Sequence, residues 1–118
     1  MGLPEHWEQV RVVKALKRAR EIFCAVPNGG YRVRHEAVKL KAEGVMAGVP
    51  DLLIFSVPDG ANFVGVALEM KKATGKKSDL RKAQKEWLAR LQACGWVALV
   101  GYGGKDAIEK LRGLGYDL

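Results

Sequence analysis

Two apolar runs separated by a short turn constrain the fold of this chain more than any other feature. Residues 51–57 read DLLIFSV, residues 62–72 read NFVGVALEMKK, and Pro58-Asp59-Gly60 lies between them. Pro, Asp and Gly all favour a tight turn, each through its own backbone or side-chain preference. Two apolar runs on either side of such a turn predict a pair of antiparallel strands. The runs are apolar enough for both strands to be buried.

The segment after this hairpin predicts a helix that returns the chain to the same sheet. Ser78 or Asp79 is a suitable cap for a helix that runs to about Cys94. Residues 96–102 then read WVALVGY, which predicts a further strand. Because a helix connects them, we expect the strands at 62–72 and 96–102 to lie parallel to each other.

The remaining elements flank this core. Apolar spacing and stop signals predict helices at about 4–21, 34–43 and 105–111, with a short strand at 22–26. The expected order is helix, strand, helix, strand, strand, helix, strand, helix (αβαββαβα). In a chain of 118 residues, this order predicts a single α/β domain over residues 1–118. Its mixed sheet should carry helices on both faces.

The two cysteines and the lack of a long apolar run exclude several classes of protein. Cys24 and Cys94 have no partner at metal-ligand spacing, which excludes a zinc finger and a disulfide scaffold. Their apolar neighbours predict reduced core residues. No apolar run approaches about 18 residues, and the N-terminus MGLPE does not resemble a signal peptide. We therefore expect a cytoplasmic protein without a membrane partner.

Positive charge is concentrated in one part of the sequence. The chain has a net charge of +7, and the segment from Lys71 to Lys85 holds seven basic residues and one acid. A basic loop and helix start can hold phosphates without reading base sequence, although a solvated helix face would look the same. We expect a nucleic-acid partner. The residues that we expect to contact its phosphate backbone are Arg32, Arg34, Lys72, Lys76, Lys77, Arg81 and Lys82.

Acidic residues at one end of the hairpin are the candidates for chemistry. Asp51 begins the first strand, and Glu69-Met70-Lys71 closes the second. Side chains alternate along a strand, so Glu69 and Lys71 point the same way. If the strands pair, Asp51 and Glu69 lie near each other and repel unless a cation lies between them. Oxygen ligands without His or Cys favour Mg²⁺ or Mn²⁺. Taken alone, Asp51 is more simply an acid that faces water.

Five short motifs follow one another in a distinctive order. They are PNGG at 27–30, AVKLKAEGV at 37–45, GVPDL at 48–52, EMK at 69–71 and QKEWL at 84–88. In this order they resemble the VRR-NUC family in its compact stand-alone form, within the PD-(D/E)xK nuclease superfamily. The resemblance covers nearly the whole chain and implies a restriction-endonuclease-like core.

This resemblance also implies a function. It suggests a metal-dependent, structure-selective endonuclease that hydrolyses phosphodiester bonds of DNA, similar to Holliday-junction resolvases. Such an enzyme would act as a homodimer on branched or duplex DNA in a bacterial or phage-infected cell. The resemblance makes Asp51, Glu69 and the Met70 carbonyl the ligands of Mg²⁺ or Mn²⁺. It makes Lys71 the catalytic lysine and places Gln84 near the site.

The family also places a glutamate of the first helix at the metal. Glu5 falls in the middle of the apolar stripe of that helix and Glu8 on its edge, so Glu5 is the first choice. Both also fit acids that merely favour a helix start. An alternative function is a non-catalytic nucleic-acid-binding module on the same fold. A sequence-specific enzyme that cuts duplex DNA is a third, but little chain remains for a recognition element.

Overall fold

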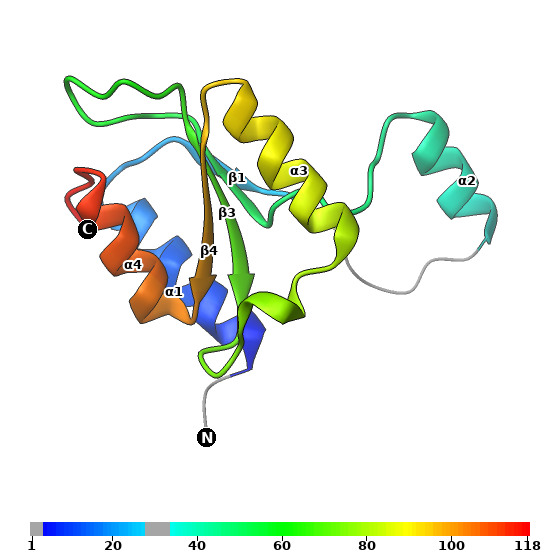
Figure 1. The fold of residues 1–118 in the computed structure, drawn as a ribbon, viewed down its shortest axis with the longest axis horizontal. Coiled ribbons are helices and arrows are strands. Elements are labelled where there is room, and N and C mark those ends of the chain that lie inside the picture. The colour runs from blue at the N-terminus through cyan, green and yellow to red at the C-terminus, as the bar shows by residue number, and fades with distance from the viewer. Residues whose placement is uncertain (1–3, 28–33) are drawn as a thin grey trace.

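A computed structural model describes residues 4–27 and 34–118, and its helices and strands follow the predicted order (Figure 1). No helix in this part of the chain is long and apolar enough to cross a membrane. The elements are α1 (Glu5–Arg18), β1 (Phe23–Ala25), α2 (Arg34–Ala42), β2 (Leu52–Ile54), β3 (Val66–Lys71), the 3-10 helix η1 (Lys77–Asp79), α3 (Lys82–Ala93), β4 (Val97–Tyr102) and α4 (Gly104–Gly113).

The described strands form one mixed sheet in the order β1-β2-β3-β4. β2 and β3 make the predicted antiparallel hairpin, with Leu53 opposite Ala67. β3 and β4 are parallel, as the connecting helix predicted, with Glu69 level with Val100. β1 pairs antiparallel with β2, and just beyond this ladder the N–H of Val26 donates to the carbonyl oxygen of Asp51 at 2.8 Å.

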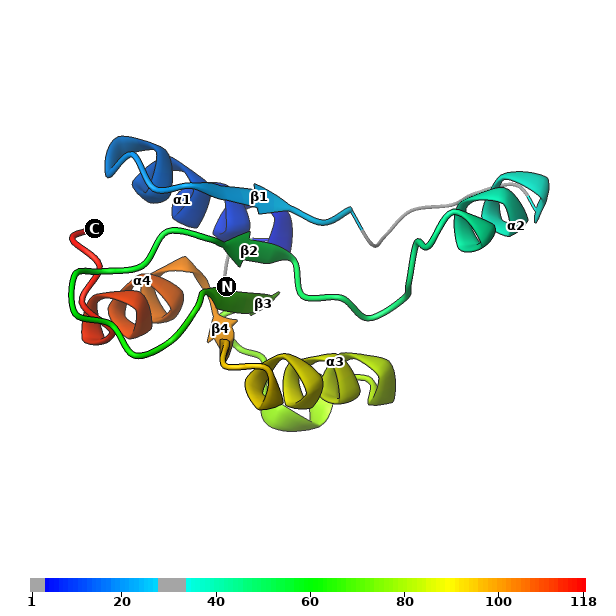
Figure 2. The same cartoon turned by 90° about the horizontal axis from the view of Figure 1, so that it is seen from above.

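The two faces of β3 serve different purposes. Val66, Leu68 and Met70 are fully buried in the core, which also contains side chains of α1 and α4. Each such side chain contributes roughly 1.5–3 kcal/mol by leaving water. Figure 2 shows α1 and α4 on this side of the sheet and α3 on the other. Glu69 and Lys71 lie on the α3 side, so α3 covers the polar face of the strand.

Two local predictions are wrong. Neither Ser78 nor Asp79 caps α3, because the Asp79 carboxylate accepts the N–H of Lys76 at 2.9 Å and closes η1 instead. Cys24 and Cys94 are exposed rather than buried. Cys24 lies on the edge strand β1, and Cys94 follows the last turn of α3, so neither position is covered by a second layer.

The observed strands are also shorter than the apolar runs. The β2–β3 ladder ends where Ile54 pairs with Val66, and residues 55–65 leave it as a long loop. Outside the ladder, the N–H of Phe55 donates to Ile22 and that of Val64 donates to Gly95. The flanking apolar residues therefore bond to other segments instead of extending the hairpin.

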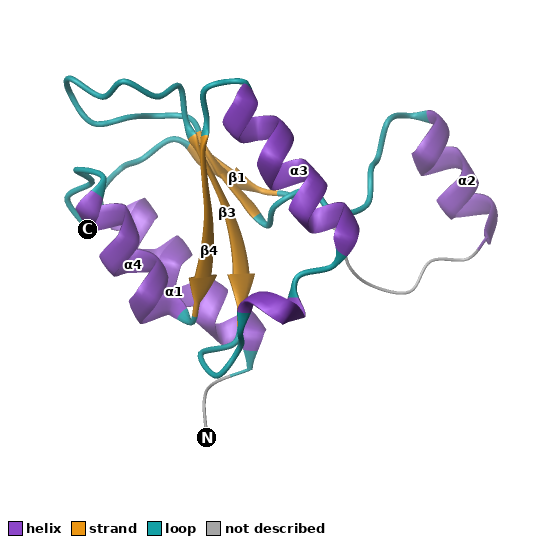
Figure 3. Ribbon diagram, viewed as in Figure 1, coloured by secondary structure: helices purple, strands orange, loops and turns teal. Residues whose placement is uncertain are grey.

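Helix α2 lies apart from the other elements, as Figure 3 shows. It is nine residues long and none of them is buried. Val38 is 63% exposed, and Val45 and Met46 beyond the helix are about half exposed. We call residues 34–47 the arm. The arm therefore has apolar surface that the rest of the described chain leaves exposed. An isolated helix of this length is also marginal in water.

Candidate active site

Three carboxylates from three separate elements meet at one end of the sheet. Glu5 begins α1, Asp51 directly precedes β2, and Glu69 lies on β3. One oxygen atom of each lies within 4.8 Å of the others. They line a pocket of about 270 Å³ together with Lys71 and Gln84. The donor set consists of carboxylate oxygens, which suits Mg²⁺ or Mn²⁺ better than Zn²⁺.

A backbone hydrogen bond holds Asp51 beside β3. Its Oδ2 accepts the N–H of Met70 at 2.7 Å. The regular ladder between β2 and β3 begins only at Leu52, which pairs with Leu68. The Asp51 side chain therefore takes the next strand amide in place of a backbone carbonyl. This contact brings its carboxylate next to Glu69.

Glu69 is an acid in an environment that disfavours its charge. It is only 3% exposed. Burial raises its pKa from 4.5 to about 8, and the Asp51 carboxylate and a hydrogen bond between the two carboxyl groups act in the same direction. The Lys71 ammonium, with Nζ 3.9 Å from Glu69 Oε2, opposes this shift but does not cancel it. A divalent cation in place of the proton would relieve the repulsion between the carboxylates.

Gln84 connects Glu69 to the start of α3. Its Nε2 donates to Glu69 Oε2 at 3.1 Å, and its Oε1 accepts the N–H of Arg81 at 2.9 Å. Arg81 is the N-cap of α3, so Gln84 occupies the position whose side chain returns to the cap. One amide therefore both closes the helix end and fixes one oxygen of the buried acid.

The first-helix acids are placed differently from each other. Glu5 belongs to the cluster but is exposed. Glu8 is the buried one, at 3% exposure, and it bonds to Arg11 and to the N–H of Gly104. The apolar stripe of the first helix therefore selected the acid near the pocket, but it was wrong about which acid is buried, since it took no account of α4.

The other predicted residues lie in different parts of the structure. The side chain of Met70 lies in the core, and its carbonyl as a metal ligand stays a prediction. Arg34 is exposed on the arm, away from the acids, and Arg32 lies outside the described residues. Arg81 lines the acidic pocket. The remaining basic candidates are exposed between the end of β3 and the start of α3, and they are Lys72, Lys76, Lys77 and Lys82.

Gly48 has a role that sequence reasoning missed. It entered the expectations only as part of a motif, but it lines the acidic pocket. Its φ is +88°, and a Cβ there would lie 2.7 Å from the Cβ of Ala83 on α3. Glycine is therefore needed for the segment before Asp51 to pass close to α3. The signal in the sequence was the motif GVPDL, whose first residue is this glycine.

Comparisons with known proteins agree with the fold described above. A family model described as "VRR-NUC domain" matches residues 3–103. A solved structure described as "VRR_NUC domain protein" is similar, with a TM-score of 0.77 and 27% sequence identity. The similarity covers 97% of this chain and 89% of that chain. A search of curated proteins gave no match. The matched region contains all three clustered acids.

Proposed function

Because the chain belongs to the VRR-NUC family, a nuclease-type family, we propose that it is a metal-dependent endonuclease that hydrolyses phosphodiester bonds of DNA. The observation that carries this proposal is the convergence of Glu5, Asp51 and Glu69 within 4.8 Å. Like charges in such proximity are costly for a protein that only binds DNA, because they also repel phosphate. They are useful where a cation must be held against a phosphate group.

The acids of this chain would hold Mg²⁺ or Mn²⁺, with the Met70 carbonyl as a further ligand. When bound, such an ion supplies Lewis-acid stabilisation of the phosphoryl oxygens and lowers the pKa of its water ligand. The Lys71 ammonium lies beside Glu69, where it can stabilise negative charge that develops on the phosphate. Gln84 would orient Glu69 by donating to its Oε2.

The basic stretch between Lys71 and Lys85 would hold the DNA backbone. It begins in the strand that carries Glu69 and includes Arg81, which lines the pocket. Lysine and arginine contacts to phosphate position a duplex without reading its sequence. The stretch therefore supports a substrate selected by its shape, such as the branched DNA cut by Holliday-junction resolvases.

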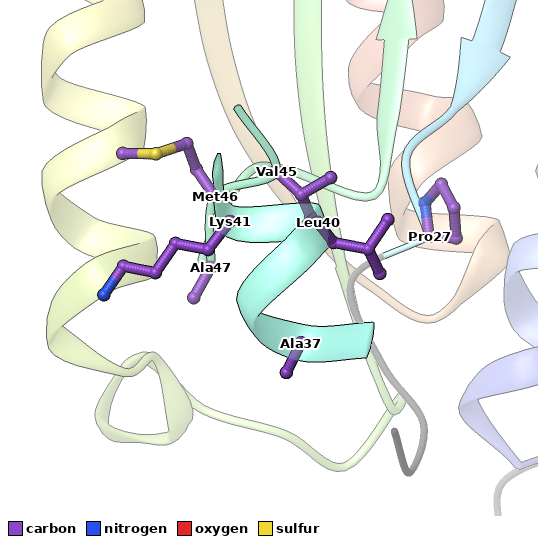
Figure 4. Close-up of a pocket in the computed structure, with 7 residues that line it drawn as sticks. All are labelled: Pro27, Ala37, Leu40, Lys41, Val45, Met46 and Ala47. Atoms are coloured by element: carbon purple, nitrogen blue, oxygen red, sulfur yellow. The ribbon is translucent and has the colours of Figure 1, made fainter. Parts of the chain in front are cut away.

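A second copy of the chain would cover the arm. The arm and Pro27 form an open apolar pocket of about 450 Å³ (Figure 4). The lining of this pocket is apolar apart from Lys41, which suits a protein partner better than a polyanion. Two copies would supply the two active sites that paired cuts in two strands require. The lining residues are Pro27, Ala37, Leu40, Lys41, Val45, Met46 and Ala47.

The test of the proposed dimer is sedimentation at micromolar concentration. We expect the wild-type chain to sediment at twice its mass of 12.9 kDa. Leu40→Glu should give a monomer, because it places a charge in the apolar pocket. Lys39→Glu, on the same helix but outside the residues that line the pocket, is the matched control. A wild-type monomer would contradict the resolvase-like version but not hydrolysis itself.

The test of the function is an assay on single-stranded, duplex, flap and four-way DNA with and without Mn²⁺. We expect cleavage of branched DNA that depends on the metal. Lys71→Ala should remove cleavage and leave DNA binding within a few-fold. Salt-dependent binding without any metal-dependent cleavage would instead support the non-catalytic binding module.

A further inference from the structure

Glu8 is a buried acid that the proposed reaction does not use. Its Oε1 accepts the N–H of Gly104 at 3.1 Å and lies 3.2 Å from Nη1 of Arg11. A buried carboxylate is costly unless such partners satisfy it. α4 begins at Gly104, so the carboxylate also faces the positive end of that helix. Glu8 therefore links α1 to the start of α4.

Two glycines make this link possible. Gly103 has a φ of +86°, and a Cβ there would lie 2.9 Å from Oε2 of Glu8. A Cβ on Gly104 would lie 2.9 Å from the backbone oxygen of Glu8. A larger residue at Gly104 would push α1 away from the turn between β4 and α4, and one at Gly103 would displace the Glu8 carboxylate. The close approach of helix and turn is therefore built into the sequence at both positions.

The same turn is bonded to the strand that carries the active-site residues. The N–H of Gly103 donates to the carbonyl oxygen of Lys71 at 2.8 Å. Glu5 lies three residues before Glu8, about one helical turn earlier. Through Glu8 and the glycine turn, the first turn of α1 is therefore connected to the end of β3.

We propose that Glu8 is a positioning residue that holds Glu5 against Asp51 and Glu69 by joining α1 to the turn between β4 and α4. This inference rests on the proposed metal site, to which it adds a residue that acts through Glu5 and not on the ion. Removing the link lets the first turn of α1 move, and the cluster then binds a divalent cation more weakly.

A double-mutant cycle with Mn²⁺ alone tests the proposal. Titration calorimetry of the DNA-free protein should show that Glu5→Ala and Glu8→Ala each weaken Mn²⁺ binding by about tenfold. The double variant should bind no more than about twofold more weakly than Glu5→Ala, because two residues that act as one unit are not additive. Glu8→Gln keeps an acceptor for Gly104 and should restore most of the affinity.

A control separates positioning from a general loss of stability. Tyr116→Phe removes the hydrogen bond from the phenol to the carbonyl oxygen of Ser56, 2.7 Å long, at the opposite end of the sheet. It should lower stability and leave Mn²⁺ affinity unchanged. Wild-type affinity in Glu8→Ala, or losses that multiply in the double variant, would overturn the proposal. If Glu8→Ala does not fold, the same cycle is run with Glu8→Gln, whose smaller loss should vanish in the Glu5→Ala background.

Adding Asp51→Ala to the Mn²⁺ titrations distinguishes this inference from the proposed function. Unchanged Mn²⁺ binding in Asp51→Ala contradicts the metal site itself. If Asp51→Ala removes binding but Glu5→Ala or Glu8→Ala does not weaken it, the metal site stands and the positioning role of Glu8 is wrong.

Discussion

The acids at the two ends of the sheet have opposite surroundings. At one end, the Glu21 carboxylate accepts a hydrogen bond from the Ser56 hydroxyl, whose oxygen accepts the N–H of Ile22 at 2.8 Å. At the other end, Asp51 and Glu69 face each other, and burial and mutual repulsion raise the pKa of Glu69 to about 8. The first arrangement pairs one acid with a donor, whereas the second brings acids together although Met70 and Gln84 donate to them.

This difference indicates which end is built for stability and which for binding. Satisfied polar groups stabilise a fold, whereas acids forced together lower its stability unless a ligand compensates them. Tyr116 completes the first end by donating to the carbonyl oxygen of Ser56. We call these the paired end and the acidic end. Substitutions at the two ends should therefore differ in sign as well as in size.

The largest expected difference concerns cleavage. Asp51→Ala should reduce the rate of Mn²⁺-dependent cleavage of branched DNA by at least about 10²–10³-fold, because it removes a metal-binding carboxylate. Ser56→Ala at the paired end should leave the rate within about twofold once the protein is shown to be folded. Single-turnover cleavage measures both. Full activity in Asp51→Ala would show that the acidic end is not the catalytic site.

The second difference concerns the pH dependence of metal binding. A pKa of about 8 for Glu69 means that a proton and Mn²⁺ compete for this acid below that pH. Mn²⁺ affinity should therefore rise by up to about tenfold per pH unit toward pH 8 and level off above it. Glu69→Gln should bind weakly at every pH. An affinity that does not change between about pH 6 and 8 would contradict this coupling.

The third difference concerns stability without metal. The pKa of Glu69 is higher in the folded protein than in the unfolded chain, so its contribution to stability is present at low pH and is lost as pH rises toward about 8. In EDTA at about pH 8.5, Glu69→Gln should raise the free energy of unfolding by about 1–2 kcal/mol. Urea denaturation at several pH values measures this, and a destabilised variant would show that repulsion does not dominate the acidic end.

The smallest effect belongs to the paired end and has the opposite sign. Tyr116→Phe should lower the free energy of unfolding by about 1 kcal/mol, because the carbonyl of Ser56 loses its donor. Urea denaturation at neutral pH is sufficient, since burial raises the pKa of Tyr116 to about 12 and the phenol stays protonated. Equal effects of this variant and Glu69→Gln would remove the contrast between the two ends.

The sequence predicted those contacts that depend on neighbouring residues or on paired strands. The turn at Pro58-Asp59-Gly60 predicted the hairpin, and alternation along β3 placed Glu69 and Lys71 on one face. The hairpin in turn placed Asp51 beside Glu69. These residues lie close in sequence or in paired strands, so a pattern of period two is enough to relate them.

Contacts between distant segments escaped prediction. Glu8 is buried because its partner is Gly104, 96 residues later, and no pattern in the first helix shows that. The cap of α3 was missed for a different reason, since several side chains near residues 78–84 can cap a helix and only the packed structure selects one. The exposure of Cys24 depended on which strand lies at the edge of the sheet.

The hydrogen bond between Val26 and Asp51 affects how far the arm between these residues can vary in length and sequence. The backbone leaves the sheet after Val26 and rejoins it at Asp51, so the arm begins and ends at neighbouring points of the sheet. Lengthening the arm costs little, because loop-closure entropy grows only with the logarithm of its length. Residues 34–46 of the arm thus tolerate changes of length and sequence, whereas Ala47 and Gly48 are constrained because they line the acidic pocket.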